Sequence, residues 1–408
     1  MPDFAQSELT PEGSTWETAK LISQAAAQFA YLLGPLPPED LMGLVEVELG
    51  HSEILERFCA YRSFKPPGHD EIIQYSRAQG PQQILHILSG NTPHAALQSL
   101  IRGLLLGAHN LCKIPARGLP EVQAFRDALP APLCHEIEIT ENLPDEWLKA
   151  SDAVIVFGND ETIEHFQRHV RPDQIFIAHG HRLSFAVVFE DPHRESLPLL
   201  ARDVALFEQQ GCLSPHVVYV KESFGLDAPT YAQELAWALE DIAKELPPKK
   251  MSEDEAAFLM NLRTSYRFKA ANYPDQVALH VSEGSTDWTV VYEKDPLFSV
   301  SALNRFITVK PLPVNLAGSI AQVRKHLSAV GIYPATAENA NLLARYGISR
   351  ICGIGKMQEP FITWHQDGQA SLAPLVRWVD YEHPVLPPSF RTAELPLHPD
   401  SERSRRRR

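Results

Sequence analysis

Short apolar runs, each followed by a turn and a helical pattern, recur through the first half of the chain. The clearest runs are residues 83–88, 110–114, 153–157 and 174–177. Runs this short and this apolar are typical of parallel strands that helices cover on both faces. We therefore predict an α/β fold in which the turns after these strands share one sheet edge, the edge at which open α/β sheets bind ligands.

The second half of the chain continues the alternation with another set of β-rich runs. They cover residues 217–220, 277–281, 288–292 and 305–309. A helix is predicted over 316–330. Residues 1–80 are predicted to form only helices, which prolines separate from one another. We divide the chain into a first α/β domain with its N-terminal helices (1–209), a second α/β domain (210–365) and a returning C-terminal segment (366–408).

Composition and charge place the chain among ordinary cytoplasmic globular proteins. Of its 408 residues 44% are hydrophobic and 22% are charged, and no run approaches the ~18 apolar residues of a membrane span. The net charge of −14 gives no reason to expect a nucleic-acid partner, although the chain ends in a short arginine-rich tail. The five cysteines form no CxxC pair and the N-terminus is polar. We therefore expect reduced thiols, no metal site and no signal peptide.

Cys212 stands where a helical pattern stops at Gly211 and a Ser-Pro turn leads into the run 217–220. This position holds a side chain at the mouth of a sheet, where unpaired backbone N–H groups can favour a thiolate. Cys212 is therefore a candidate nucleophile. The alternative is a small buried core residue, which is the commoner role of a free cysteine.

A second candidate site follows the run 153–157. Gly158 permits a tight turn, and Asn159 or Asp160 can cap the next helix, whose N-terminus attracts a pyrophosphate. The glycine pattern GxGxxG is absent, so this turn by itself favours a structural cap over a phosphate site.

Several of these turns, in this order, resemble the aldehyde dehydrogenase superfamily, and more closely its fatty acyl-CoA reductase branch of the bacterial bioluminescence type. The motifs are SGNTP at 89–93, NLCKIP at 110–115, VFGNDE at 156–161, IAHGH at 177–181 and QQGCLSP at 209–215. The resemblance implies an aldehyde dehydrogenase-like fold. Residues 1–209 would contain a Rossmann-type dinucleotide-binding domain, and 210–365 the catalytic domain.

The resemblance also implies a role for individual residues. Cys212 would attack a thioester carbonyl and form an acyl-enzyme. Asn91 stands at the oxyanion-hole amide of the family, where its side chain would act with the Cys212 backbone N–H. Lys113 stands at the lysine that binds the adenosine ribose, and Gly158 and Asn159 at the cofactor turn.

One departure from the superfamily pattern bears on the reaction. Where the oxidising members carry a glutamate that activates water, this chain has Ala178, with His179 beside it. Without that base the acyl-enzyme would not be hydrolysed, which favours its reduction to an aldehyde. His179, His181 and His216 are each candidate bases for Cys212, although a structural role is commoner for any one histidine.

Another departure concerns the cofactor. Arg117 stands near the position of a glutamate that binds the ribose 2′-hydroxyl in NAD-dependent relatives, and an arginine suits a 2′-phosphate. We therefore expect an NADPH-dependent reductase of a long-chain acyl-CoA or carrier-bound acyl thioester. By resemblance the partners are an acyl-protein synthetase and further copies of the chain. The alternatives are an acyltransferase or acyl-carrier module, and an aldehyde dehydrogenase that makes the acid.

Overall fold

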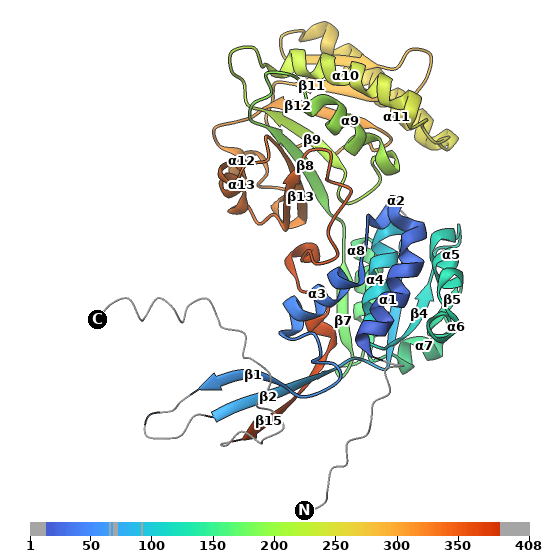
Figure 1. Ribbon diagram of the computed structural model, residues 1–408. Helices are drawn as coiled ribbons and strands as arrows, with labels where there is room; N and C mark the ends of the chain where they lie inside the picture. The colour runs from blue at the N-terminus through green and yellow to red at the C-terminus, as the bar shows by residue number, and fades with distance from the viewer. Residues whose placement is uncertain (1–13, 65–66, 68–71, 91–92, 384–408) are drawn as a thin grey trace, which may run out of the picture.

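The computed structural model describes residues 14–64, 67, 72–90 and 93–383 of the chain. Within them the chain forms two parallel β-sheets, each flanked by helices, and a separate three-stranded antiparallel sheet (Figure 1). The prediction of an α/β fold is thereby confirmed.

The first parallel sheet has five strands, and every neighbouring pair is parallel. In spatial order the strands are β5 (Ile137–Thr140), β4 (His109–Lys113), β3 (Gln83–Ile87), β6 (Ala153–Phe157) and β7 (Ile175–His179). The helices of this unit are α1 (Thr15–Ala26), α2 (Ala30–Leu33), α3 (Pro38–Leu49), α4 (Pro93–Leu105), α5 (Pro120–Ala128), α6 (Ala131–Cys134), α7 (Asp145–Ala150) and α8 (Asp160–Gln167).

Alternate side chains of this first sheet enter two different cores. Ile84 faces a core that it shares with Leu97 of α4 and Ile22 of α1. Leu85, the next residue, faces the opposite side and packs with Phe166 of α8. Both faces are therefore covered, which explains why these strands are almost continuously apolar.

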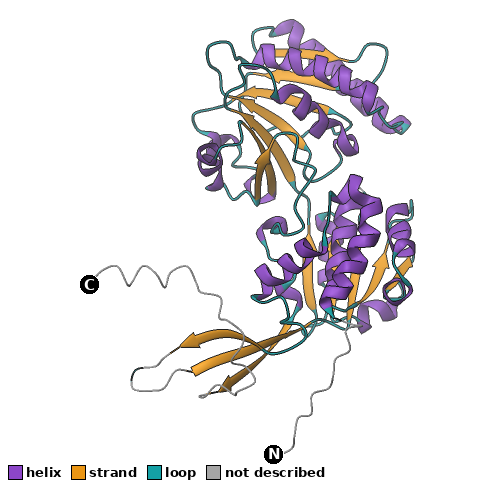
Figure 2. Ribbon diagram, in the orientation of Figure 1, coloured by secondary structure: helices purple, strands orange, loops and turns teal. Residues whose placement is uncertain are grey.

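The second parallel sheet has seven strands, of which only the edge pair β10–β11 is antiparallel. In spatial order they are β10 (Val277–Val281), β11 (Thr289–Glu293), β12 (Phe306–Pro311), β9 (Pro215–Val220), β8 (Leu183–Val188), β13 (Leu327–Tyr333) and β14 (Arg350–Gly353). Its helices are α9 (Ser196–Ala205), α10 (Ala228–Glu245), α11 (Glu253–Asn272), α12 (Leu316–Ser319) and α13 (Ala337–Ala344). Figure 2 shows helices on both faces of this sheet too.

The third sheet joins the C-terminal end of the described chain to two strands that follow α3. Strand β2 (Ile72–Gln79) lies between β1 (Cys59–Phe64) and β15 (Arg377–His383) and pairs with both in antiparallel register. The last described strand thus pairs with a strand from the N-terminal part of the chain. Figure 2 shows this sheet projecting away from both parallel sheets.

Three sequence predictions differ from the structure. Cys59–Phe64 and Ile72–Gln79 are strands although helices alone are expected up to residue 80, and the helix expected over 316–330 ends at Ser319 before β13 begins. The first sheet ends with β7, and β8 already belongs to the second sheet, so the boundary between them lies well before residue 209. The first two differences arise because a short local pattern does not by itself distinguish strand from helix, and the third because the run 183–188 was not identified as a strand.

Among the residues that the structure describes, no helix is both long and apolar enough to span a membrane.

Candidate active site

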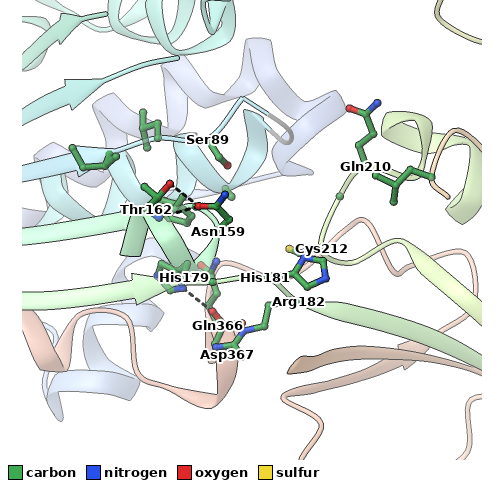
Figure 3. A pocket seen from close by; sticks show the side chains of 18 of the residues that line it. Ser89, Asn159, Thr162, His179, His181, Arg182, Gln210, Cys212, Gln366 and Asp367 are labelled. Carbon is green, nitrogen blue, oxygen red and sulfur yellow. Dashed lines mark hydrogen bonds and ion pairs between the residues drawn. The ribbon is translucent and has the colours of Figure 1, made fainter. Parts of the chain in front are cut away.

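A cavity of about 540 Å³ lies where the two parallel sheets meet (Figure 3). From the first sheet it is lined by residues that follow the strands: Ser89 after β3, Gly158 after β6 and Gly180 after β7. From the second sheet it is lined by residues that precede strands, including Cys212 before β9. The prediction that the strand-ending turns of the first sheet share one edge is confirmed.

The predicted cofactor residues lie on the side of the cavity formed by the first sheet. Lys113, Gly158 and Asn159 all line it. The Asn159 Oδ1 atom caps α8, because it accepts the Thr162 backbone N–H at 2.9 Å and the Thr162 hydroxyl at 2.8 Å. A Cβ atom on Gly158 would lie 2.9 Å from the Thr162 side chain, so this turn requires glycine.

Arg117 lies outside the cavity lining but beside it. Its side chain is exposed and lies over the turn after β3, where a Cβ atom on Gly90 would be 2.6 Å from the Arg117 Nε atom. Asn91, the predicted oxyanion donor, falls outside the described residues.

Cys212 is held firmly by its neighbours on the second sheet. The Ser184 hydroxyl donates to the Cys212 carbonyl at 2.7 Å and accepts the Ala329 N–H at 3.1 Å, which ties the cysteine to β8 and β13. Burial, with a smaller effect from the Asp367 charge, raises the pKa of the Cys212 thiol to about 12. The side chain is half-buried where it lines the cavity, and this shift runs against the predicted thiolate. The thiol is accordingly protonated near pH 7 and must lose its proton to a base as it reacts.

His179 forms a partly buried dyad with Asp367. Its Nδ1 atom lies 2.8 Å from Asp367 Oδ2, and the Arg182 Nε–H donates to Asp367 Oδ1 at 2.8 Å. Burial acts to raise the pKa of Asp367, but the hydrogen bonds and charges of His179 and Arg182 outweigh it and hold this pKa below its ordinary value. A carboxylate only accepts, so His179 carries its proton on Nδ1 and leaves Nε2 as the acceptor. The ring stacks on Phe157, with centroids 4.6 Å apart.

The other two candidate histidines also line the cavity, but their settings differ. His216 is buried, and its Nδ1 atom accepts the Ser301 backbone N–H at 3.0 Å. Burial, with a smaller contribution from His181, lowers the pKa of His216 to about 4. The neutral ring therefore carries its proton on Nε2, where it is a donor and not a base. His181 is exposed at the cavity.

The chain matches a known protein family over most of its length. The model of the acyl-CoA reductase (LuxC) family matches residues 14–378, which include both parallel sheets and the whole cavity. The chain belongs to the acyl-CoA reductase (LuxC) family. It is accordingly an oxidoreductase of the luminescence type that reduces an acyl group.

Relatives of this acyl-CoA reductase family member are similar along most of its length. The long-chain acyl-protein thioester reductase of Aliivibrio fischeri is 27% identical over 362 residues, covering 84% of this chain and 71% of that protein. The enzyme of the same description from Vibrio harveyi is 23% identical over 363 residues, with the same coverage.

Solved structures show the fold. A putative aldehyde dehydrogenase PutA from Anabaena variabilis superposes with a TM-score of 0.60 at 14% identity, covering 94% of this chain and 90% of that one. A putative methylmalonate-semialdehyde dehydrogenase from Sinorhizobium meliloti 1021, complexed with NAD, gives a TM-score of 0.59 at 12% identity, covering 92% and 87%. The family member thus has the predicted aldehyde dehydrogenase-like fold.

Two polar residues of the cavity in this family member were given no role from its sequence. Asp367 is separated from His179 by 188 positions, and nothing along the chain indicates that the two meet. Arg182 lies only three positions after His179 but had no identified partner. A signal was present at Asp367-Gly368, a pair suited to a left-handed turn, and Asp367 has a φ of 56°.

Proposed function

We propose that the chain reduces a long-chain fatty acyl thioester to the fatty aldehyde through an acyl intermediate on Cys212, with NADPH as the cofactor. The observation that carries the proposal is the shared cavity, which Cys212, the His179–Asp367 dyad and the strand-ending turns of the first sheet all line. The names of the relatives, long-chain acyl-protein thioester reductases, support the choice of substrate.

The first sheet offers a setting that fits a dinucleotide. The turns after three parallel strands, β3, β6 and β7, line one cavity, and Lys113 reaches it from the end of β4. At the N-terminus of α8 the Asn159 side chain already accepts a backbone N–H, and Asp160 and Glu161 already place negative charge in the first turn. We therefore assign the cofactor to Lys113 and the backbone of the strand ends, and its 2′-phosphate to Arg117 beside the Gly90 turn.

In the first half of the reaction Cys212 becomes acylated. Its Sγ atom bonds to the thioester carbonyl carbon, and the C–S bond to the donor thiol breaks. Because the raised pKa keeps Cys212 protonated, a base must accept its proton during the attack, and we assign this role to Nε2 of His179. His179 then returns the proton to the departing thiol. The Cys212 backbone N–H and the Asn91 side chain would bind the oxyanion.

In the second half the acyl group leaves as an aldehyde. When bound, the reduced nicotinamide supplies the hydride that the acyl carbonyl carbon gains. The Sγ–C bond then breaks, the carbonyl reforms, and Cys212 keeps the electron pair and takes up a proton that comes from solvent, by way of His179. Ala178, at the end of β7, brings no carboxylate that would activate water for hydrolysis instead.

A single-turnover experiment tests this sequence of steps. The protein is incubated with a long-chain acyl-CoA, intact mass is measured, and NADPH is then added. We expect a mass increase that is absent in Cys212→Ala and that NADPH discharges as aldehyde. Acyl groups that load but stay in place would support the acyltransferase alternative, and release of the free acid would support the aldehyde dehydrogenase alternative, with His179 as the base for water.

The acyl donor is the remaining choice. Coenzyme A and an acyl-protein present the same thioester to Cys212, so a comparison of loading rates from the two donors distinguishes them. An acyl-protein synthetase partner and a homo-oligomer stay predictions from the family resemblance.

A further inference from the structure

Two left-handed turns meet beside the nucleophile. Phe207, Glu208 and Gln209 have φ angles of 54°, 53° and 60°, immediately before the Cys212 loop. Residues 303–305, immediately before β12, have φ angles of 61°, 52° and 61°. Side-chain-bearing residues rarely adopt this conformation, and it persists only where the surroundings hold it in place.

An ion pair and a backbone hydrogen bond join the two turns. The Arg305 Nε and Nη2 atoms each donate to a different Glu208 carboxylate oxygen at 3.0 Å, and the Asn304 N–H donates to the Glu208 carbonyl at 2.9 Å. Arg305 is 1% exposed and its third nitrogen donates to the Leu246 carbonyl at 2.9 Å. The paired geometry is the strong, directional form of an arginine–carboxylate contact.

A second connection spans the loop that carries the cysteine. The Gln209 side chain donates to the Pro215 carbonyl at 2.7 Å, so it closes a bridge across residues 210–214. The Ser301 hydroxyl lies 3.1 Å from the other end of this amide. Gln210, directly after the first turn, and Leu303, in the second turn, both line the cavity.

We propose that Glu208 and Arg305 are a positioning pair, which holds the two left-handed turns together and so sets the direction of the Cys212 thiol and its backbone N–H toward the acyl group. Neither residue lines the cavity, so the pair acts through the loop and touches no substrate. The link to acylation rests on the proposed function, whereas the effect on loop geometry does not.

The test replaces both charges at once. Glu208→Met/Arg305→Met leaves no unpaired buried charge, and such exchanges are often tolerated by the fold. The matched control is Glu293→Met/Lys310→Met, which removes a comparable pair. Lys310 is 1% exposed, lies on β12, the strand that directly follows Arg305, and contacts Glu293 at 2.7 Å outside the cavity lining. Thermal melting confirms folding of each variant.

Two rates are measured for each variant. We expect Cys212 acylation at saturating acyl-CoA to fall at least ~30-fold in Glu208→Met/Arg305→Met, with the affinity for NADPH unchanged, and to stay within about threefold in the control. Alkylation of Cys212 by iodoacetamide, followed by mass, should rise at least about fivefold in the first variant only, because a loosened loop exposes the thiol.

Each outcome decides the proposal. Wild-type rates of acylation in a folded Glu208→Met/Arg305→Met variant would overturn it, as would equal changes in the control. If that variant does not fold, Arg305→Lys, which keeps the charge but not the paired bonds, must show the same two changes in smaller form. If the wild type accepts no acyl group, the proposed function fails, and the alkylation rates alone then support or reject the pair.

Discussion

The two parallel sheets face the same cavity with opposite edges. The first sheet presents its carboxyl edge, with Ser89, Lys113 and His179 at or just beyond the ends of β3, β4 and β7. The second sheet presents its amino edge, with Cys212 just before β9 and Leu303 just before β12. One sheet thus offers the groups expected to bind a ligand, and the other offers the group expected to react with it.

The carboxyl edge of the second sheet has a cavity of its own. Its volume is about 560 Å³, similar to the shared one, and its lining includes Lys221 after β9 and Glu190 after β8. It contains neither a cysteine nor a histidine. The rule that ligands bind at the carboxyl edge therefore agrees with the first sheet. In the second sheet the candidate nucleophile lies at the amino edge, so the rule does not locate the candidate site there.

Removal of the nucleophile should give the largest difference between the two edges, because it should abolish the reaction and leave cofactor binding unchanged. Cys212→Ala leaves the cofactor side of the cavity intact but provides no atom to bond to the acyl carbon. We expect aldehyde formation to fall by roughly 10⁴-fold or more, as for other covalent catalysts. NADPH binding, measured by tryptophan fluorescence, should be unchanged, and its loss would show that the two edges are not independent.

The dyad comes next in expected effect. His179→Ala removes the proposed base, and acylation should slow ~10²- to 10⁴-fold, the range typical of general acid–base catalysis. Asp367→Asn should lower the rate in the same direction, since the amide no longer holds the His179 proton on Nδ1. A rapid-mixing acylation assay measures both. Full activity in His179→Ala would show that His179 is not the base and would leave His181 as the candidate.

The pH dependence of the thiol provides a third prediction. Because the pKa of Cys212 is about 12, its thiolate fraction should rise about tenfold per pH unit below that value. Alkylation by iodoacetamide should therefore increase roughly 100-fold from pH 7 to pH 9 without levelling off. A plateau below pH 9 would mean that the thiol is not held in a buried setting.

Arg117 tests the cofactor side alone. Arg117→Ala should reduce kcat/KM for NADPH by ~10- to 100-fold, the effect of lost hydrogen bonds to a charged group, and leave kcat/KM for NADH unchanged. The control is Arg168→Ala, another exposed arginine of the first domain. Steady-state kinetics with both cofactors measure kcat/KM for each. Equal losses with NADPH and NADH would show that Arg117 does not bind the 2′-phosphate.

The smallest effect is expected at the second sheet's own carboxyl edge. Lys221→Ala changes the cavity that contains no candidate nucleophile or base, so kcat and KM should stay within about twofold of the wild type. A larger loss in the steady-state assay would show that this edge also takes part in the reaction.

Candidate site residues that are marked by their neighbours along the chain could be found from the sequence. Cys212 lies in a loop between a helical pattern and an apolar strand, and Lys113 and Asn159 lie at or just after short apolar runs. These features depend on neighbours a few positions apart, because strand, turn and cap preferences are properties of short segments. The α/β class and the shared edge of the first sheet followed from the same local patterns.

Only the tertiary structure decided which distant residues meet. Asp367 reaches His179 across 188 positions, and Arg305 reaches Glu208 across 97. Strand β8 was not predicted, although its six residues are buried like those of β6, and its place in the second sheet is set by pairing with β9 and β13. Such contacts depend on how whole sheets pack against each other. The burial that raises the pKa of Cys212 likewise arises only once the sheets are packed.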